Sequence, residues 1–598
     1  MDWRRPLEAA LDAAVAAGEI LRRDFHHPGG ARGAVDKAEA DVEAERLIRA
    51  RLTEAFPGWG YVGEETGRAA GEPGRPVWLV DPNDGTRDYL AGRRGSAVSI
   101  GLLADRRPVL GVVFAFAYPD DEGDVFTWAE GCGPVRRNGR PAPAHLPDSL
   151  SARDVVLVSS KGDRDPETNL RCADPARYRT VPSIAHRLAL VAAGEAAAAT
   201  SLHAPGAWDY AAGDALLRGA GAVLVNEEGA EVGYAEDGTS QTVRAFAASK
   251  AVASELARRP WSEVSTGPWR GERPASLVKG RAVEDTGLLS RAQGCLLGQI
   301  AGDNLGALVE FCTAAEIAAL HPDGPRLLED GGRWSLLAGQ PTDDSEMALA
   351  LARAVVAAGT YDGGKVLDAY RAWYRSDPFD VGDTTRAALV GYLVADSQSN
   401  GSLMRASPLG VLAWPLPPEE AAALARADAA LTHPHPVCGD ATAAFVVAAA
   451  HAVRHGDARG AWEAARAWAR GAASLPVREA LDRAAREAPV CDDSSQGWVL
   501  VTLQAAFHAL LHAPSLEEGV VATVRRGGDT DTNAAVAGAL LGAVHGRPAL
   551  PAQWREAVLS CRPHPARAQH PRTMEYWPCD VLEVAECLLG LNDDAAGS

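Results

Sequence analysis

The amino-acid sequence predicts two domains, an N-terminal α+β layered domain and a C-terminal all-α domain. Over the first ~250 residues, segments with strand periodicity alternate with segments with helical periodicity. After residue 286 the strand signal nearly vanishes. Between these regions, residues 259–283 are rich in Pro, Gly, Arg and Ser and follow neither periodicity, as is typical of an interdomain linker. We therefore expect domains at 1–258 and 284–598, joined by a linker at 259–283.

The N-terminal domain is expected to begin with two helices. Apolar residues recur on one helical face between Leu7 and Phe25, and a second helix is expected from Ala38 to Leu52. Strand-like runs follow at 77–81, 96–103, 108–118 and 124–130. Their spacing, and the turns between them, predict an antiparallel meander packed against helices. Further strands and helices alternate up to about Ser249.

The C-terminal domain is expected to consist of Ala- and Leu-rich helices between Thr286 and Leu589, joined by loops rich in Gly and Pro. Two of these helices carry glycines at every fourth position: Gly294, Gly298, Gly302 and Gly306 in one, and Gly538, Gly542 and Gly546 in the other. Each glycine costs about 1 kcal/mol of helix propensity relative to alanine. A stripe on one face repays that cost if it lets a neighbouring backbone approach closely.

Composition and charge limit the function classes. The 598 residues include 59 Lys+Arg and 79 Asp+Glu, for a formal net charge of -20, which argues against broad nucleic-acid binding. The nine cysteines are dispersed without a C-x-x-C pair, as is typical of reduced thiols in a cytoplasmic protein. No run of about 18 uncharged apolar residues predicts a membrane span. We expect a cytoplasmic protein with no membrane partner.

A first cluster of carboxylates follows a predicted strand. Glu64 lies in a Gly-Glu-Glu loop, and the run VWLVDPNDGTRDY at 77–89 ends a strand with two carboxylates around a turn, Asp81 and Asp84. Oxygen ligands that converge in this way suit Mg²⁺. Taken alone, D-P-x-D-G-T is equally typical of a turn capped by an Asx side chain. Asp209 precedes an apolar helix in WDYAAG, where a simple helix N-cap is the alternative.

These motifs, in this order, resemble the inositol monophosphatase family over roughly residues 5–250. The resemblance implies an α/β/α/β sandwich and a Mg²⁺-dependent phosphatase. It implies Mg²⁺ ligands at Glu64, Asp81, the carbonyl of Asn83, Asp84 and Asp209, a water-activating pair at Asp41 and Thr86, and substrate binding at Gly85. The sequence departs from the family at Ala38, where Thr is usual, and at Asn83, where an aliphatic residue is usual. Arg87-Asp88-Tyr89 is more similar to members that act on 3′-phosphorylated nucleotides.

A second cluster of carboxylates lies in the helical domain. Thr342-Asp343-Asp344-Ser345 opens one predicted helix, and Gly527-Gly528-Asp529-Thr530-Asp531-Thr532 opens the second glycine-striped helix. Acidic residues at helix N-termini are favoured by the helix dipole, so a single pair needs no functional explanation. If the two pairs converge, four carboxylates repel one another unless cations lie between them.

This second pattern resembles the ADP-ribosylglycohydrolase family over roughly residues 286–590. The resemblance rests on GCLLGQIAGDNLGALVEF at 294–311, P-T-D-D-S, SNGSLMRASPLG at 399–410, THPHP at 432–436 and GGDTDTNAAVAGALLG. It implies a binuclear Mg²⁺ centre at Thr342, Asp343, Asp344, Asp529, Asp531 and Thr532, with Glu310 assisting glycosidic cleavage. Asn400, Gly401 and Ser402 form a loop suited to a pyrophosphate. His433 either lines the ribose pocket or is a core or helix-capping histidine.

The two resemblances together predict a bifunctional hydrolase. The N-terminal half is expected to bind two or three Mg²⁺ and to cleave a small-molecule phosphate ester, such as an inositol phosphate, a sugar phosphate or a 3′-phosphonucleotide. The C-terminal half is expected to bind two Mg²⁺ and to cleave the N- or O-glycosidic bond of an ADP-ribosylated protein or a small ADP-ribosyl conjugate. The alternative is that only the glycohydrolase half is active and that the phosphatase-like half is a phosphate- or nucleotide-binding module.

Overall fold

The computed structural model describes residues 2–265, 285–492 and 494–591. These residues form two compact units, which divide between residues 265 and 285. We describe each unit by itself.

The N-terminal unit is built around an eight-stranded sheet with the order β10-β9-β8-β7-β6-β5-β3-β4. Its strands are β3 (Gly60–Gly63), β4 (Gly67–Ala69), β5 (Val77–Asp84), β6 (Ala97–Ala104), β7 (Arg107–Ala115), β8 (Asp124–Ala129), β9 (Arg136–Arg137) and β10 (Arg140–Pro141). Strands β5 to β8 pair in sequence as antiparallel neighbours, so the predicted meander is confirmed. Only β3 and β5 pair in parallel within this sheet. β6 and β7 are buried on both faces, because helices cover the sheet on both sides.

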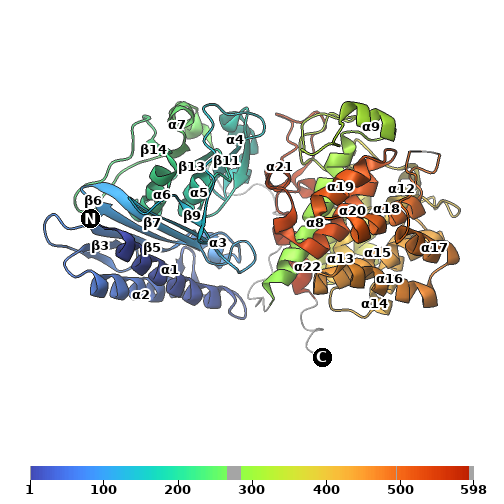
Figure 1. The fold of residues 1–598 in the computed structure, drawn as a ribbon, viewed down its shortest axis with the longest axis horizontal. Coiled ribbons are helices and arrows are strands. Elements are labelled where there is room, and N and C mark those ends of the chain that lie inside the picture. Colours follow the sequence, from blue (N-terminus) through green and yellow to red (C-terminus); the bar gives the residue numbers. More distant parts are fainter. Residues whose placement is uncertain (1, 266–284, 493, 592–598) are drawn as a thin grey trace. The chain divides into compact units, whose positions relative to one another are not determined.

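Helices and a second sheet complete the layers of this unit (Figure 1). Helices α1 (Arg4–Phe25) and α2 (Glu39–Ala55) cover one face of the large sheet, and α5 (Ile184–Ala192) and α6 (Ala207–Ala220) cover the other. Beyond α5 and α6 lies a five-stranded sheet in the order β12-β11-β13-β15-β14. Its strands are β11 (Val155–Val158), β12 (Arg177–Thr180), β13 (Ala198–Ser201), β14 (Val223–Asn226) and β15 (Ala245–Ala248), and a two-residue hairpin is formed by β1 (Gly33–Ala34) and β2 (Lys37–Ala38).

The predicted α, β, α and β layers are therefore present, and a fifth layer follows them. Helices α4 (Pro166–Ala173) and α7 (Lys250–Ala257) pack on the outer face of the five-stranded sheet. Between them and the sheet lies a separate apolar cluster that includes Phe246, Leu256 and Trp261. The short helix α3 (Thr86–Leu90) and the 3₁₀ turns η1 (Gly162–Arg164) and η2 (Trp261–Glu263) complete the unit.

The start of the predicted linker packs into this outer layer. Trp261 is buried, and its indole N–H donates to the carbonyl of Leu256 at 2.9 Å. Residues 259–265 therefore belong to the N-terminal unit, because the burial of Trp261 anchors this segment although the residues around it are mostly polar. The rest of the predicted linker, residues 266–283, lies outside the described residues.

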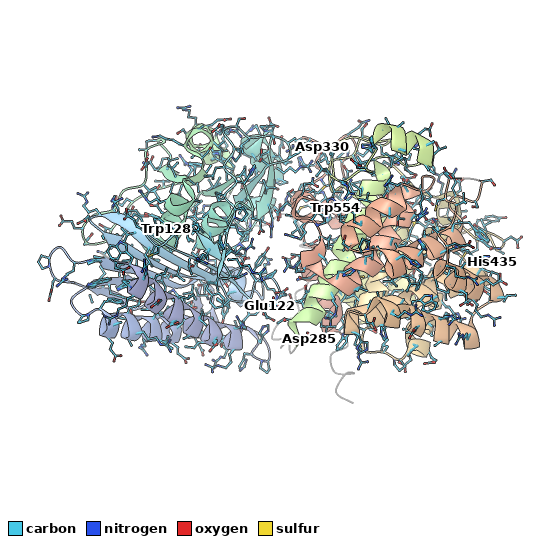
Figure 2. The ribbon with its side chains drawn as sticks, in the orientation of Figure 1. Glu122, Trp128, Asp285, Asp330, His435 and Trp554 are labelled. Carbon is cyan, nitrogen blue, oxygen red and sulfur yellow. The ribbon has the colours of Figure 1, made fainter. Side chains whose placement is uncertain are left out.

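The described residues of the C-terminal unit form helices joined by loops, with isolated β-bridges and no strand, as the sequence predicts. Asp285 caps its first helix and is labelled in Figure 2. The helices are α8 (Thr286–Ala307), α9 (Ala314–Leu320), α10 (Asp343–Ala358), α11 (Gly363–Arg375), α12 (Asp383–Leu389), α13 (Ser407–Leu412), α14 (Pro418–Ala430), α15 (Pro436–His455), α16 (Ala458–Ala472), α17 (Leu475–Ala484), α18 (Val499–His512), α19 (Leu516–Val524), α20 (Thr530–His545), α21 (Ala552–Ser560) and α22 (Val581–Gly590), with the 3₁₀ turns η3 (Asn400–Ser402), η4 (Arg547–Ala549) and η5 (Met574–Tyr576).

The two glycine stripes face each other across the helix pair α8 and α20. A Cβ atom built on Gly298 would lie 2.2 Å from the carbonyl oxygen of Gly538, and one built on Gly542 would lie 1.9 Å from the carbonyl oxygen of Gly294. The two backbones are thus in direct contact, and no larger residue fits. This contact fixes the N-terminal end of α20 beside the C-terminal end of α8, where the predicted site residues lie.

One described helix, α15, is long and apolar enough to cross a membrane by length and composition alone. In the most apolar 18-residue stretch of α15, 83% is buried inside the protein. The helix packs against α14, α16, α13, α20 and α8. It is therefore a core helix of the C-terminal unit. All nine cysteines are free thiols.

Candidate functional sites

A β-bulge in β5 brings the two aspartates of the first cluster to one side of the sheet. Asp81 pairs with Ser99 of β6 and Asp84 pairs with Ala97, so β5 contains one more residue than β6 between these pairs. Residues three apart in a regular strand point to opposite faces, and the extra residue cancels that difference. The sequence predicts that this strand ends at Asp81, but in the structure it continues to Asp84. Gly85, with a φ of 99°, turns the chain into α3.

Two further carboxylates join this pair. Because β3 runs parallel to β5 with Gly63 opposite Val80, Glu64 leaves the sheet beside Asp81. Asp209 occupies the first turn of α6, where its side chain accepts the amide of Gly206 at 2.8 Å. A cavity of about 330 Å³ is lined by Glu64, Asp81, Asn83, Asp84, Gly85, Thr86 and Asp209 among others.

The electrostatics of this cluster fit a divalent cation. Burial raises the pKa of Glu64 to about 7, and burial and the neighbouring carboxylates raise the pKa of Asp81 and Asp209 well above the usual range. Asp84 also has a raised pKa through burial, although Ser183 and the Ala185 amide donate to it. Crowded carboxylates of this kind repel one another, and a cation between them removes the repulsion. The donors are all hard oxygens, which is the set that Mg²⁺ prefers.

Asp41 lies behind this cavity and reaches it through Asn83 and Thr86. The Asn83 side-chain amide donates to Asp41 Oδ1 at 2.9 Å, and the Thr86 hydroxyl lies 3.4 Å from Asp41 Oδ2 and 2.9 Å from the Asn83 carbonyl. Burial raises the pKa of Asp41 to about 6. Ala38 offers only its backbone N–H, which donates to Asp41 at 3.1 Å. The side chain of Asn83 therefore holds Asp41 in place, in addition to the metal ligand expected from its main-chain carbonyl.

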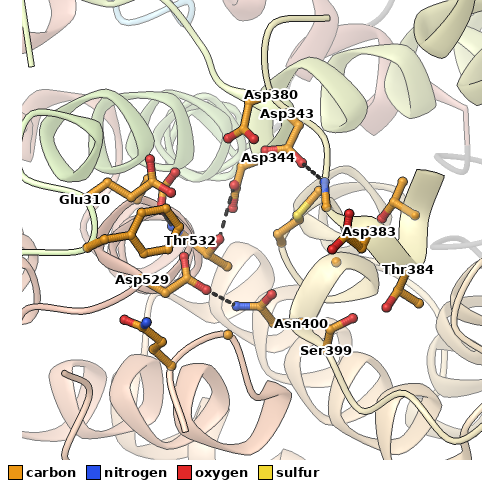
Figure 3. A pocket seen from close by; sticks show the side chains of 18 residues that line it. Glu310, Asp343, Asp344, Asp380, Asp383, Thr384, Ser399, Asn400, Asp529 and Thr532 are labelled. Carbon is orange, nitrogen blue, oxygen red and sulfur yellow. Dashed lines mark hydrogen bonds between the residues drawn. The ribbon is translucent and has the colours of Figure 1, made fainter. Parts of the chain in front are cut away.

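The second cluster surrounds a cavity of about 290 Å³ in the C-terminal unit (Figure 3). Asp343 and Asp344 enter it from the first turn of α10, and Asp529, Asp531 and Thr532 enter it from the start of α20. All five are buried or nearly so. The Thr532 hydroxyl donates to Asp344 Oδ2 at 3.2 Å, so the two helix N-termini meet at this point.

A buried aspartate of α8 holds the start of α10 in place. Asp303 accepts the Thr342 amide and hydroxyl, the latter at 2.9 Å, and the Ser345 amide at 3.2 Å. Thr342 is thus oriented by Asp303 and does not line the cavity, although its hydroxyl lies 3.4 Å from Asp344. The only signal in the sequence for this role is a lone aspartate within an apolar, glycine-striped helix.

Glu310 also lines the cavity, and Figure 3 shows it together with Asp529 and Asn400. The Trp334 indole N–H donates to Glu310 Oε2 at 2.6 Å, and burial raises the pKa of Glu310 to about 8. Two backbone hydrogen bonds tie its loop to the start of α20: Phe311 donates to the Gly528 carbonyl at 2.7 Å, and Gly528 donates to the Cys312 carbonyl at 2.9 Å. Both loops thus hold a fixed position relative to each other.

Asp380 is a further carboxylate of this cavity that sequence reasoning missed. Ligand oxygens of Glu310, Asp380 and Asp531 lie within 4.8 Å of one another, as in a group that holds a metal ion. Asp380 belongs to the loop before α12, and no motif marks it. Burial raises its pKa, and burial together with Asp380 raises the pKa of Asp343 well above the usual range. Asp344 Oδ1 is buried without a hydrogen-bond partner among the described residues, which suits an oxygen that binds a cation.

The predicted substrate loop lies only partly in the cavity. Asn400 and Gly401 line it, and the Asn400 amide donates to Asp529 Oδ2 at 2.7 Å. Ser402 is buried behind the loop and bonds to Thr442. His433 is also buried there, 3.0 Å from the hydroxyl of the cavity residue Ser399. A Cβ built on Gly401 would lie 2.8 Å from the His433 ring, so these residues shape the loop from behind.

Comparison with known proteins gives a separate match for each unit. Residues 2–263 match the model of the inositol monophosphatase family, and residues 284–579 match that of the ADP-ribosylglycohydrolase family. The chain is 34% identical to inositol monophosphatase 1 of Solanum lycopersicum, over 40% of this chain and 89% of that protein. It is 33% identical to the ADP-ribosyl-(dinitrogen reductase) glycohydrolase of Rhodospirillum rubrum, over 44% of this chain and 88% of that protein. A solved ADP-ribosylglycohydrolase-related protein complex matches 51% of this chain and 99% of its own, with 28% identity and a TM-score of 0.43.

Proposed function

Because the chain belongs to the inositol monophosphatase family over residues 2–263 and to the ADP-ribosylglycohydrolase family over residues 284–579, and is therefore a hydrolase, we propose that both halves are active. The N-terminal half releases phosphate from a small phosphate ester. The C-terminal half releases ADP-ribose from a modified protein or a small conjugate by cleaving its N- or O-glycosidic bond. The observation that carries this proposal is that each unit gathers its own set of buried oxygen donors around its own cavity.

In the N-terminal half, Glu64, Asp81, the Asn83 carbonyl, Asp84 and Asp209 would hold Mg²⁺, which would supply charge stabilisation and activate a water. The chain's own residues move the proton. Asp41 has a pKa of about 6, so near neutral pH it is an ionised base with a pKa suited to its task. The Thr86 hydroxyl lies between Asp41 and the cavity and relays the proton of the attacking water to it.

In the C-terminal half, Asp343, Asp344, Asp529, Asp531 and Thr532 would hold Mg²⁺, with Thr342 behind Asp344, and the metal would supply charge to bind the ribose hydroxyls and to orient water. Burial raises the pKa of Glu310 to about 8, which favours its protonated form near neutral pH. Trp334 occupies its Oε2, which leaves Oε1 to donate that proton to the departing group. Asn400 and Gly401 line the cavity where the pyrophosphate is expected, supported by Ser402 and His433.

The nine free cysteines favour a reducing compartment, and we place both reactions in the cytoplasm. Both families are metal-dependent. We assign two or three Mg²⁺ to the N-terminal site and two to the C-terminal site, which suits the two separate carboxylate clusters.

Two assays on the purified full-length protein test the proposal. Phosphate release is measured on inositol phosphates, sugar phosphates and 3′-phosphonucleotides, and ADP-ribose release is measured on ADP-ribosylated protein and small conjugates, each with Mg²⁺ and with EDTA. We expect Mg²⁺-dependent release in both assays. Binding of phosphate esters without turnover makes the N-terminal half a binding module and leaves only the glycohydrolase active. No release in either assay contradicts the proposal.

A further inference from the structure

Arg572 joins two parts of the C-terminal unit from behind the wall of its cavity. It belongs to the segment 561–580 between α21 and α22, and its side chain is buried. Its Nε donates to Oε1 of Glu346 at 2.8 Å and to Oε2 of the same residue at 3.0 Å, in an ion pair whose two side chains are both buried. Glu346 lies in the first turn of α10, which also carries Asp343 and Asp344. The arginine thus anchors the helix end that presents these two carboxylates to the cavity.

The same guanidinium group holds the start of the loop that carries Asp380. Its Nη1 donates to the carbonyls of Ser376 at 3.0 Å and Asp377 at 3.3 Å, and its Nη2 donates to the Ser376 hydroxyl at 2.8 Å. Asp380 follows three residues after Asp377 and is one of the three carboxylates whose oxygens lie within 4.8 Å of one another. Arg572 therefore fixes α10 and this loop, residues 376–382, relative to each other.

Other contacts hold the rest of this loop. The Phe379 ring contacts the His570 ring, with centroids 4.8 Å apart, and the Trp334 ring, with centroids 6.0 Å apart. The Gly382 amide donates to Asp343 Oδ2 at 3.3 Å. The segment that contains the arginine thus holds the loop at its start and centre, and α10 holds the end of the loop.

We propose that Arg572 is a positioning residue of the C-terminal site, which sets the place of Asp380 relative to the carboxylates of α10. The inference rests on the proposed glycohydrolase function and adds a residue to it. Arg572 lies behind the cavity wall and does not line the cavity, so it acts through the groups that it holds. Arginine suits this task because its rigid planar group directs donors from three nitrogens, here toward two separate elements, whereas lysine has a single nitrogen.

ADP-ribose release by the full-length protein with Mg²⁺ tests the inference in a double-mutant cycle. Arg572→Lys keeps a positive charge beside Glu346 but loses the directed hydrogen bonds to the loop. It is expected to lower kcat roughly tenfold, since a small misplacement of site groups has effects of this scale or more. In Asp380→Asn protein the same change is expected to cost less than about twofold, because effects that act through one group are not additive. Equal losses of kcat in the two backgrounds overturn the inference.

Arg353→Lys is the matched control for folding. Arg353 is a buried arginine of the same helix that forms an ion pair with Asp580 and donates to the carbonyls of Glu575 and Trp577. Among the described residues its hydrogen bonds go to the segment 561–580 and not to the loop that carries the further carboxylate. We expect this control to lower the melting temperature as Arg572→Lys does, but to keep kcat for ADP-ribose release.

Amide hydrogen exchange separates the inference from the proposed function, because it needs neither substrate nor turnover. Arg572→Lys is expected to speed exchange at residues 376–382, whereas Arg353→Lys leaves exchange there unchanged. Faster exchange in the first variant, in a protein whose wild type releases no ADP-ribose, supports the positioning of the loop while the glycohydrolase function fails. Exchange at residues 376–382 that is the same in Arg572→Lys and in the wild type overturns the inference.

Discussion

The close contact between the two glycine-striped helices predicts that replacing one of these glycines by alanine destabilises the protein, although the same change usually stabilises a helix. Replacing glycine by alanine inside a helix ordinarily stabilises it by about 1 kcal/mol. In Gly298→Ala, however, the new Cβ would lie 2.2 Å from the carbonyl oxygen and 2.9 Å from the carbonyl carbon of Gly538. Both atoms are backbone atoms of a second packed helix, so no side-chain rotation relieves the clash. The helices must separate instead.

The expected magnitude follows from two opposing effects. Overpacking in a tight core costs about 1–3 kcal/mol, and a backbone-to-backbone clash belongs at the upper end of that range. Subtracting the gain of about 1 kcal/mol in helix propensity leaves a net destabilisation of roughly 1–2 kcal/mol. For a unit of this size the melting temperature falls by about 2 °C for each kcal/mol. We therefore expect a decrease of roughly 2–4 °C.

Calorimetric unfolding of the full chain measures this effect. The transition of the C-terminal unit is the one that ADP-ribose with Mg²⁺ raises, because a ligand stabilises the unit that binds it. Gly471→Ala is the matched control: it changes a helical glycine of α16 whose new Cβ meets nothing within 4 Å. This control is expected to raise the same transition slightly. A Gly298→Ala protein as stable as the wild type, or more stable, refutes the reasoning.

Three further predictions concern the sites. Asn83→Leu removes the amide that donates to Asp41 at 2.9 Å, so the pKa of Asp41 is expected to rise. In a plot of the rate of phosphate release against pH, the acid limb then moves up by about one pH unit. An acid limb that does not move contradicts the role of Asp41 as the base. In EDTA, lowering the pH from about 9 to 6 is expected to raise the melting temperature. The reason is that Glu310 and Glu64, with pKa values of about 8 and 7, bind protons in the folded state that the unfolded chain does not bind. Mg²⁺ should therefore stabilise the protein more at high pH, and melting temperatures that do not change with pH contradict this prediction. Asp380→Asn is expected to lower ADP-ribose release at least about tenfold, while Asp368→Asn, at a side chain 81% exposed and outside the cavity, has little effect; equal effects of the two variants contradict a role for Asp380.

Much of the fold could be predicted from the sequence because periodicity reports burial directly. The meander at β5 to β8 and the helical C-terminal half follow from alternation and from Ala- and Leu-rich runs. The glycine stripes predict close backbone approach, and the structure shows that the two stripes are partners. Pairing of segments more than 200 residues apart has no local signal. No local pattern indicates that Trp261 packs into the N-terminal unit, because the residues around it have the composition of a linker.

The candidate sites were predictable where a residue belongs to a motif and not where its role comes from packing. Asp81 and Asp84 stand in one motif, but the β-bulge that turns both to one side is a property of strand pairing. Asp303 reaches Thr342, and Asp380 reaches Glu310 and Asp531, only because the fold brings these helices and loops together. The amide bond from Asn83 to Asp41 joins residues 42 positions apart, so no local pattern reports it.

The claim that two separate metal-dependent sites operate on one chain is tested most directly by one paired measurement. Phosphate release and ADP-ribose release are measured on the wild type, Asp84→Asn and Asp529→Asn, with the exposed positions Asp237→Asn and Asp368→Asn as controls. We expect Asp84→Asn to abolish only phosphate release, Asp529→Asn to abolish only ADP-ribose release, and the controls to keep both activities. Loss of both activities in either site variant, with folding intact, or loss of neither, contradicts the account.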